Sequence, residues 1–100
     1  MTQTVRLLYI DENPEDRERV QTILADSGLA VHLIEAGTPA SLADCLVDRH
    51  YELAITEIDF PGYPGLQIIE ALRSHRPDLP VIVLTGKGSE EIAVEALKRG

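Results

Sequence analysis

Apolar residues along this chain alternate between short continuous runs and longer stretches in which they recur at helical spacing. The first run, Val5 to Ile10, is almost continuously apolar and is interrupted only by Arg6. Such a run predicts a strand that is covered on both faces. Similar runs predict three more strands, from Ala30 to Glu35, from Leu53 to Ile58 and from Val81 to Leu84.

Helices are predicted between and after these runs. The first begins at Pro14 behind the N-cap Asn13 and ends at Gly28, because proline is favoured in the first turn and glycine just past the last. The second begins at Pro39 with Thr38 as its cap, the third ends at Pro77, and the fourth is capped by Ser89. The positions expected to face the core are Val20, Ile23 and Leu24, then Leu42 and Leu46 with Cys45 or Val47, then Leu66, Ile69 and Leu72, and last Ile92, Ala96 and Leu97.

This β-α-β-α-β-α-β-α order predicts an α/β fold. Strands that alternate with helices form a parallel sheet with right-handed crossovers and helices on both faces, which is a doubly wound arrangement. Ligands of such sheets bind outside the carboxyl ends of the strands. The residues that follow each predicted strand are therefore the first candidates for a functional site.

Composition narrows the class of protein. The 100 residues form one domain, and 44% hydrophobic residues are enough for a single core. Cys45 is the only cysteine, so a disulfide framework is excluded and a reducing compartment is favoured. With no apolar run of membrane length and no signal peptide pattern, we expect a cytoplasmic domain that does not contact a membrane. The net charge of −8 argues against direct binding of nucleic acid.

Acidic residues gather at the predicted strand ends. Asp11 and Glu12 follow the first strand, Glu57 lies at the end of the third, and Thr85 follows the fourth. If the first, third and fourth strands are neighbours, the three carboxylates crowd one edge and repel one another unless a cation compensates. A hard ion such as Mg²⁺ suits these oxygen ligands, and Asp59 could add a backbone carbonyl. Thr85 would supply a hydroxyl donor beside the site.

Other polar residues give weaker signals. His32, His50 and His75 are scattered and form no ligand spacing, alone or with Cys45. The run Gly86 to Ser89 resembles part of a phosphate-binding loop but lacks the longer spacing that such loops need. Packing or surface roles are the better reading for all of them. No arrangement for nucleophilic catalysis is visible, so an enzyme is not expected.

Several segments together resemble the receiver domain of two-component response regulators. They are Leu7 to Pro14, Tyr51 to Glu57, Phe60 to Leu66, Pro80 to Gly86 and Ala93 to Gly100, which occur in the family's order and spacing. The resemblance implies a flavodoxin-like sheet of strand order 2-1-3-4, followed in the family by a fifth strand and helix. It also implies phosphoryl transfer from a histidine kinase to an aspartate at the end of the third strand, with Mg²⁺ as cofactor.

The resemblance assigns roles to individual residues. Asp11 and Glu12 correspond to the acidic pair, Asp59 to the residue that lends its main-chain carbonyl to the metal, and Thr85 to the switch hydroxyl. Pro61 sets a register that puts Glu57, not an aspartate, at the phosphoacceptor position. A shift of the register to Asp59 would move every side chain of the strand and would shorten the distance to Pro61. Glu57 is about 1.5 Å longer than aspartate, and in-line transfer tolerates little misplacement.

A second departure is the end of the chain at Gly100, before the family's fifth strand with its lysine. Residues 1–100 are therefore expected to be an incomplete receiver-like domain whose open sheet edge could promote dimerisation.

We expect a pseudo-receiver that regulates a partner, or an output region beyond Gly100, by protein contacts. One alternative is a working phosphoacceptor that uses Asp59 or an adapted site. Another is a flavodoxin-like domain that binds a flavin or a nucleotide.

Overall fold

Four strands form one parallel sheet with the order β2-β1-β3-β4. The structure is a computed structural model, and it describes residues 4–47, 50–58, 60–64 and 67–84. Its elements are β1 (Val5–Ile10), α1 (Pro14–Ser27), β2 (Val31–Ala36), α2 (Pro39–Val47), β3 (Leu53–Glu57), α3 (Gln67–His75) and β4 (Val81–Leu84). Because helices separate all four parallel strands, the α/β fold and the strand order expected from the sequence are confirmed.

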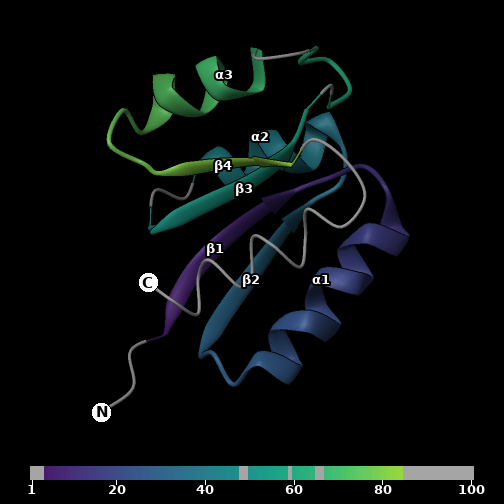
Figure 1. Ribbon diagram of the computed structural model, residues 1–100. Coiled ribbons are helices and arrows are strands. Elements are labelled where there is room, and N and C mark those ends of the chain that lie inside the picture. Colours follow the sequence, from purple (N-terminus) through teal and green to yellow (C-terminus); the bar gives the residue numbers. More distant parts are fainter. Residues whose placement is uncertain (1–3, 48–49, 59, 65–66, 85–100) are drawn as a thin grey trace.

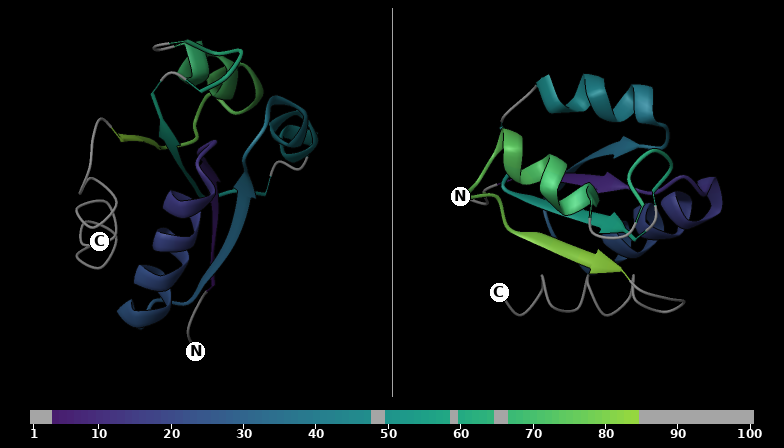
Figure 2. Two further views of the ribbon diagram at one scale, coloured as in Figure 1. Left: turned by 90° about the vertical axis from the view of Figure 1, so that its right-hand side faces the viewer. Right: turned by 90° about the horizontal axis from the view of Figure 1, so that it is seen from above.

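The helices cover both faces of the sheet (Figures 1 and 2). Helix α1 lies on one face, where its Val20 and Leu24 are buried in a cluster with Leu7 and Tyr9 of β1. Helices α2 and α3 lie on the other face. There Leu42, Ile68 and Leu72 are buried in a second cluster, which includes Leu8 and Ile10 of β1.

Strand β1 contributes to both clusters because its side chains alternate between the two faces. Leu7, Leu8, Tyr9 and Ile10 are all fully buried. The expectation of a strand covered on both faces is therefore confirmed. As β1 lies between β2 and β3, it is one of the two inner strands of the described sheet, and it carries the N-terminal part of the chain into the core.

The predicted helix signals are present in the structure. Asn13 is the N-cap of α1, and its side chain accepts a hydrogen bond from the Glu15 amide at 2.9 Å. Gly28 ends the helix with a φ of 80°, a left-handed conformation that glycine adopts readily. Thr38 caps α2, since its hydroxyl accepts a hydrogen bond from the Ser41 amide at 3.0 Å.

Two strand boundaries differ from the expected ones. Strand β2 runs from Val31 to Ala36, one residue later than predicted at each end, because its ladder with β1 pairs Val5 with Val31 and Ile10 with Ala36. Strand β3 ends at Glu57 rather than Ile58. The Ile58 amide still donates to the Leu84 carbonyl, but at a long 3.4 Å.

Two predictions about helix faces are confirmed in part. In α3 the fully buried isoleucine is Ile68, four residues before Leu72, whereas Ile69 is only partly buried against the same cluster. Consecutive residues point about 100° apart on a helix, so this choice depends on how α3 rotates on the sheet. In α2, Cys45 is the one of the two expected alternatives that packs against the core, and Val47 is 82% exposed at the last position of the helix.

The predictions for Leu66 and for the fourth helix lie outside the described residues. Among the helices that the structure describes, none combines the length and the apolar character that crossing a membrane requires.

Candidate functional site

The carboxyl ends of β1 and β3 meet at one edge of the sheet. Their ladder pairs Ile10 with Thr56, so the next residues, Asp11 and Glu57, follow side by side. Glu57 is also paired with Leu84, the last residue of β4. The topology thus brings together acidic residues that are far apart in sequence, as the strand pattern predicted. We call Asp11, Glu12 and Glu57 the carboxylate site.

Asp11 is held by hydrogen bonds at all of its polar atoms. Only 2% of the residue is exposed. Its carboxylate accepts from the Tyr9 hydroxyl and from the Asn13 amide, both at 2.9 Å. Its amide donates to the Ala36 carbonyl at 3.1 Å, and its carbonyl accepts from Arg17 Nη1 at 2.9 Å. A buried carboxylate needs such donors, and here they fix its position in the site.

Glu57 reaches back to the loop that follows β1. Its Oε1 accepts a hydrogen bond from the Glu12 amide at 3.0 Å, and its carboxyl group lies within hydrogen-bonding reach of the Asp11 carboxylate. The pKa of Glu57 is raised from its ordinary value of 4.5 to about 7, chiefly because burial removes the carboxyl group from water. The hydrogen bond from the Glu12 amide opposes this rise, whereas the Asp11 side chain and the charge of Glu12 add to it. The proton on Glu57 therefore responds to conditions near neutral pH.

The carboxylate site has some of the properties of a cation site. One oxygen of the Asp11 carboxylate accepts from the Tyr9 hydroxyl and the other from the Asn13 amide, and each keeps a lone pair for a further partner. The negative charges of Asp11 and Glu12 are a smaller cause of the raised pKa of Glu57 than burial, and a bound cation would oppose them. Even so, the described residues include no group of three or more His, Cys, Asp or Glu side chains arranged to hold a metal ion.

The sequence located some residues of the site and missed others. Asp59 and Thr85 lie outside the described residues, so their expected roles stay predictions. Tyr9 and Arg17 were missed. The period of two along a strand is a signal for Tyr9, because it puts residues 9 and 11 on the same face. No comparable pattern identifies Arg17, whose partner is a main-chain atom.

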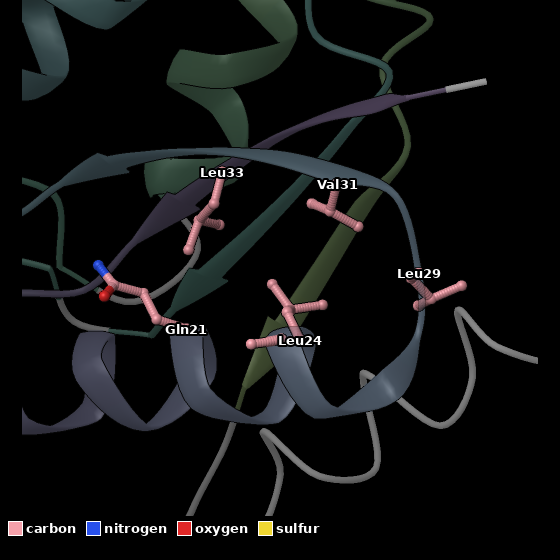
Figure 3. A pocket seen from close by; sticks show the side chains of 6 residues that line it. Gln21, Leu24, Leu29, Val31 and Leu33 are labelled. Carbon is pink, nitrogen blue, oxygen red and sulfur yellow. The ribbon is translucent and has the colours of Figure 1, made fainter. Parts of the chain in front are cut away.

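A pocket of about 200 Å³ lies away from the carboxylate site, between α1 and the first half of β2 (Figure 3). Figure 3 shows apolar side chains of the helix, the strand and the turn between them around it. Its lining residues are Gln21, Leu24, Ala25, Leu29, Val31 and Leu33. Ligands of doubly wound sheets bind at the opposite, carboxyl ends of the strands. The pocket therefore gives no support to a flavin or nucleotide site.

Sequence comparisons agree with this arrangement. The family model described as the response regulator receiver domain matches residues 7–100. The transcriptional regulatory protein FixJ of Azorhizobium caulinodans is 32% identical over 100 residues, which are 100% of this chain and 46% of FixJ. The two-component response regulator PhoP of Pseudomonas aeruginosa is 31% identical over 97 residues, which are 96% of this chain and 42% of PhoP. The chain spans less than half the length of either relative.

Solved structures show the same fold. A receiver domain protein (CheY-like) from Methanospirillum hungatei superposes with a TM-score of 0.69 at 26% identity, covering 98% of this chain and 77% of that one. The signal receiver domain of an HD domain-containing protein from Pseudomonas fluorescens gives a TM-score of 0.74 at 21% identity, covering 95% and 74%. The family match spans almost the whole chain, the fold agrees, and the acidic residues lie at the expected strand ends. The chain therefore belongs to the response regulator receiver domain family.

Proposed function

We propose that this receiver domain is a pseudo-receiver, which regulates its partner through protein contacts without taking up a phosphoryl group at Glu57. The proposal is carried by the position of Glu57 as the last residue of β3, beside Asp11, where its Oε1 is already bonded to the Glu12 amide. Receiver domains are generally not enzymes, so regulation by contact needs no further chemistry from the chain.

The chemistry of glutamate supports this proposal. The side chain carries its carboxylate one C–C bond, about 1.5 Å, farther than aspartate does. A nucleophile displaced by that amount loses the in-line geometry that phosphoryl transfer requires. The raised pKa adds to the effect, because a protonated carboxyl group is a poor nucleophile, and near pH 7 a large fraction of Glu57 holds its proton.

Receiver domains of this family typically bind Mg²⁺ at the phosphorylation site. We propose that Asp11, Glu12 and Glu57, with the carbonyl of Asp59, hold Mg²⁺ in this chain. The two fixed oxygens of Asp11 and the position of the Glu57 carboxyl group beside them support this assignment. We expect Glu12→Ala to weaken Mg²⁺ binding in a calorimetric titration. Glu15→Ala, which removes an equal charge from the exposed first turn of α1, is the matched control, and equal affinities in both variants would contradict the assignment.

Two kinds of partner fit the proposal. Receiver domains interact with histidine kinases, and the curated relatives are response regulators with output domains. We propose that the partner of this domain is such a kinase or an output region, in the cytoplasm. The acidic charge of the chain suits a basic contact surface on that partner.

A labelling experiment tests the central proposal. The full chain is incubated with Mg²⁺ and acetyl phosphate, whose phosphorus–oxygen bond would break as a carboxylate oxygen attacks and acetate leaves. A receiver with aspartate at the corresponding position is the positive control, and intact mass reports one added phosphoryl group. We expect no addition to the wild type and none to Glu57→Gln.

Two variants distinguish the remaining readings. Labelling of the wild type that disappears in Asp59→Asn would replace the proposal with a phosphoacceptor at Asp59. Labelling that disappears only in Glu57→Gln would show that the longer side chain is an adapted acceptor. Labelling gained in Glu57→Asp would show that side-chain length alone blocks the reaction.

A further inference from the structure

Arg17 connects the loop after β1 to the neighbouring strand β2. We call Asp11, Glu12 and Asn13, which join β1 to α1, the acidic loop. Arg17 lies in the second turn of α1, and its Nη1 donates to the Asp11 carbonyl at 2.9 Å. Its Nε faces Glu35 Oε1 of β2 at 3.7 Å, and both side chains are about three-quarters buried, with 23% and 28% exposed. One planar guanidinium group thus contacts the loop and the strand beside it.

Gly37 leaves space for this guanidinium group. A Cβ atom built on Gly37 would stand 2.8 Å from Arg17 Cζ and even closer to Nη1. Contacts that short do not occur between non-bonded carbon atoms, so any larger residue here would displace the end of the arginine side chain. Gly37 has no left-handed φ, so its lack of a side chain is explained by Arg17 and not by the backbone conformation.

We propose that Arg17 is the positioning residue of the carboxylate site. Gly37, which has no side chain, leaves the space that the Arg17 guanidinium group occupies. The bond to the Asp11 carbonyl holds the acidic loop at the point where the chain leaves β1. That loop presents the Asp11 carboxylate and the Glu12 amide to Glu57. The inference about metal binding rests on the function proposed above, whereas the inference about the loop geometry does not.

The position of the bond explains why it acts on the site. Asp11 has two main-chain anchors, the Arg17 side chain at its carbonyl and the Ala36 carbonyl at its amide. When the first anchor is removed, the carbonyl is left to water and the following peptide, which carries the Glu12 amide, can rotate. The Glu12 amide would then no longer donate to Glu57. The distance between the Asp11 and Glu57 carboxylates would change although neither residue is substituted.

Amide hydrogen exchange tests this effect directly. We expect the Glu12 and Asn13 amides of Arg17→Ala to exchange about tenfold faster than in the wild type without metal, since losing a charged hydrogen bond of this kind has about that effect on a local equilibrium. Arg19→Ala is the matched control, because it removes the same charge from an exposed position of the same helix. Arg17→Lys, which keeps the charge but not the planar fork, should recover only part of the protection.

A double-mutant cycle tests whether Gly37 is needed to leave space for the Arg17 guanidinium group. Gly37→Ala should accelerate exchange of the same two amides in the wild type, because the new methyl group displaces the guanidinium group. In the Arg17→Ala background the space is vacant, and Gly37→Ala should have no further effect. Unchanged exchange in Arg17→Ala, or equal effects of Gly37→Ala in both backgrounds, would overturn the proposal.

Metal titration separates this inference from the proposed function. If the wild type binds Mg²⁺, Arg17→Ala should bind it about 10-fold more weakly, which is typical for the loss of a group that orients metal ligands. Equal Mg²⁺ affinities of Arg17→Ala and Arg19→Ala would refute the positioning role. If the wild type binds no Mg²⁺, the metal assignment fails, and amide exchange alone decides the role of Arg17.

Discussion

Replacing Glu57 with glutamine should make the stability of this protein less dependent on pH. Folding raises the pKa of Glu57 from 4.5 to about 7, so between these values the folded protein holds a proton that the unfolded chain has lost. Stability from this group is therefore fully present below pH 4.5 and is lost as the pH rises through 7. Glutamine resembles the protonated side chain at every pH and keeps an oxygen acceptor for the Glu12 amide.

The size of the effect follows from the two pKa values. At about 1.36 kcal/mol per pH unit, the difference between 4.5 and about 7 corresponds to roughly 3.4 kcal/mol. Water reaches the partly exposed carboxyl group and screens it, so we expect about 1 to 2 kcal/mol. Glu57→Gln should equal the wild type near pH 4.5 and exceed its free energy of unfolding by that amount near pH 8.

Urea unfolding of both proteins between pH 4.5 and 8.5, in buffer without divalent ions, measures the difference directly. Titrations at other residues largely cancel because both proteins contain them. A difference that stays constant with pH, or that falls as the pH rises, would refute the reasoning. Mg²⁺ added at pH 8 should stabilise the wild type more than Glu57→Gln if the ion binds at the carboxylate site.

Three further substitutions test the contacts around the site and in the core. Tyr9→Phe removes the hydroxyl that donates to Asp11, so a buried carboxylate loses a donor. The free energy of unfolding should fall by about 1 to 3 kcal/mol in urea titrations. An unchanged unfolding midpoint would contradict the role of this bond. Asn13→Ala should lower it by about 1 kcal/mol through loss of the helix cap, whereas Asn13→Asp should be nearly neutral, and equal effects of the two would argue against capping. Leu42→Ala should lower the free energy of unfolding by about 2 to 5 kcal/mol, whereas Val47→Ala in the same helix should change it by less than about 0.5 kcal/mol. Comparable losses in urea titrations of the two variants would mean that α2 packs differently.

The fold could be predicted from the sequence because its signals are local and agree with one another. In the apolar run from Val5 to Ile10, the last four residues are buried on both faces, and both Asn13 and Gly28 mark the helix ends that they were expected to mark. The juxtaposition of Asp11 and Glu57 was also predictable, since parallel strands bring their carboxyl ends to one edge. This prediction needs only the strand order and no knowledge of side-chain conformation.

The remaining features depend on contacts between elements. The choice between Ile68 and Ile69 is set by the rotation of α3 on the sheet, which an apolar pair of neighbours leaves open. The bond from Arg17 to the Asp11 carbonyl involves a main-chain acceptor, and such acceptors carry no sequence signature. The place of Gly37 becomes clear only when the guanidinium group beside it is seen.

Strand β1 joins the functional end of the molecule to its interior. Its last residues before the acidic loop pack against helices on opposite sides, and no flexible spacer separates them from Asp11. A ligand that binds the Asp11 carboxylate therefore also restrains β1, which is packed between helices on both faces of the sheet. Ligand binding at Asp11 should therefore slow the local opening of β1. Hydrogen exchange of backbone amides in the centre of the sheet would then report whether the carboxylate site is occupied.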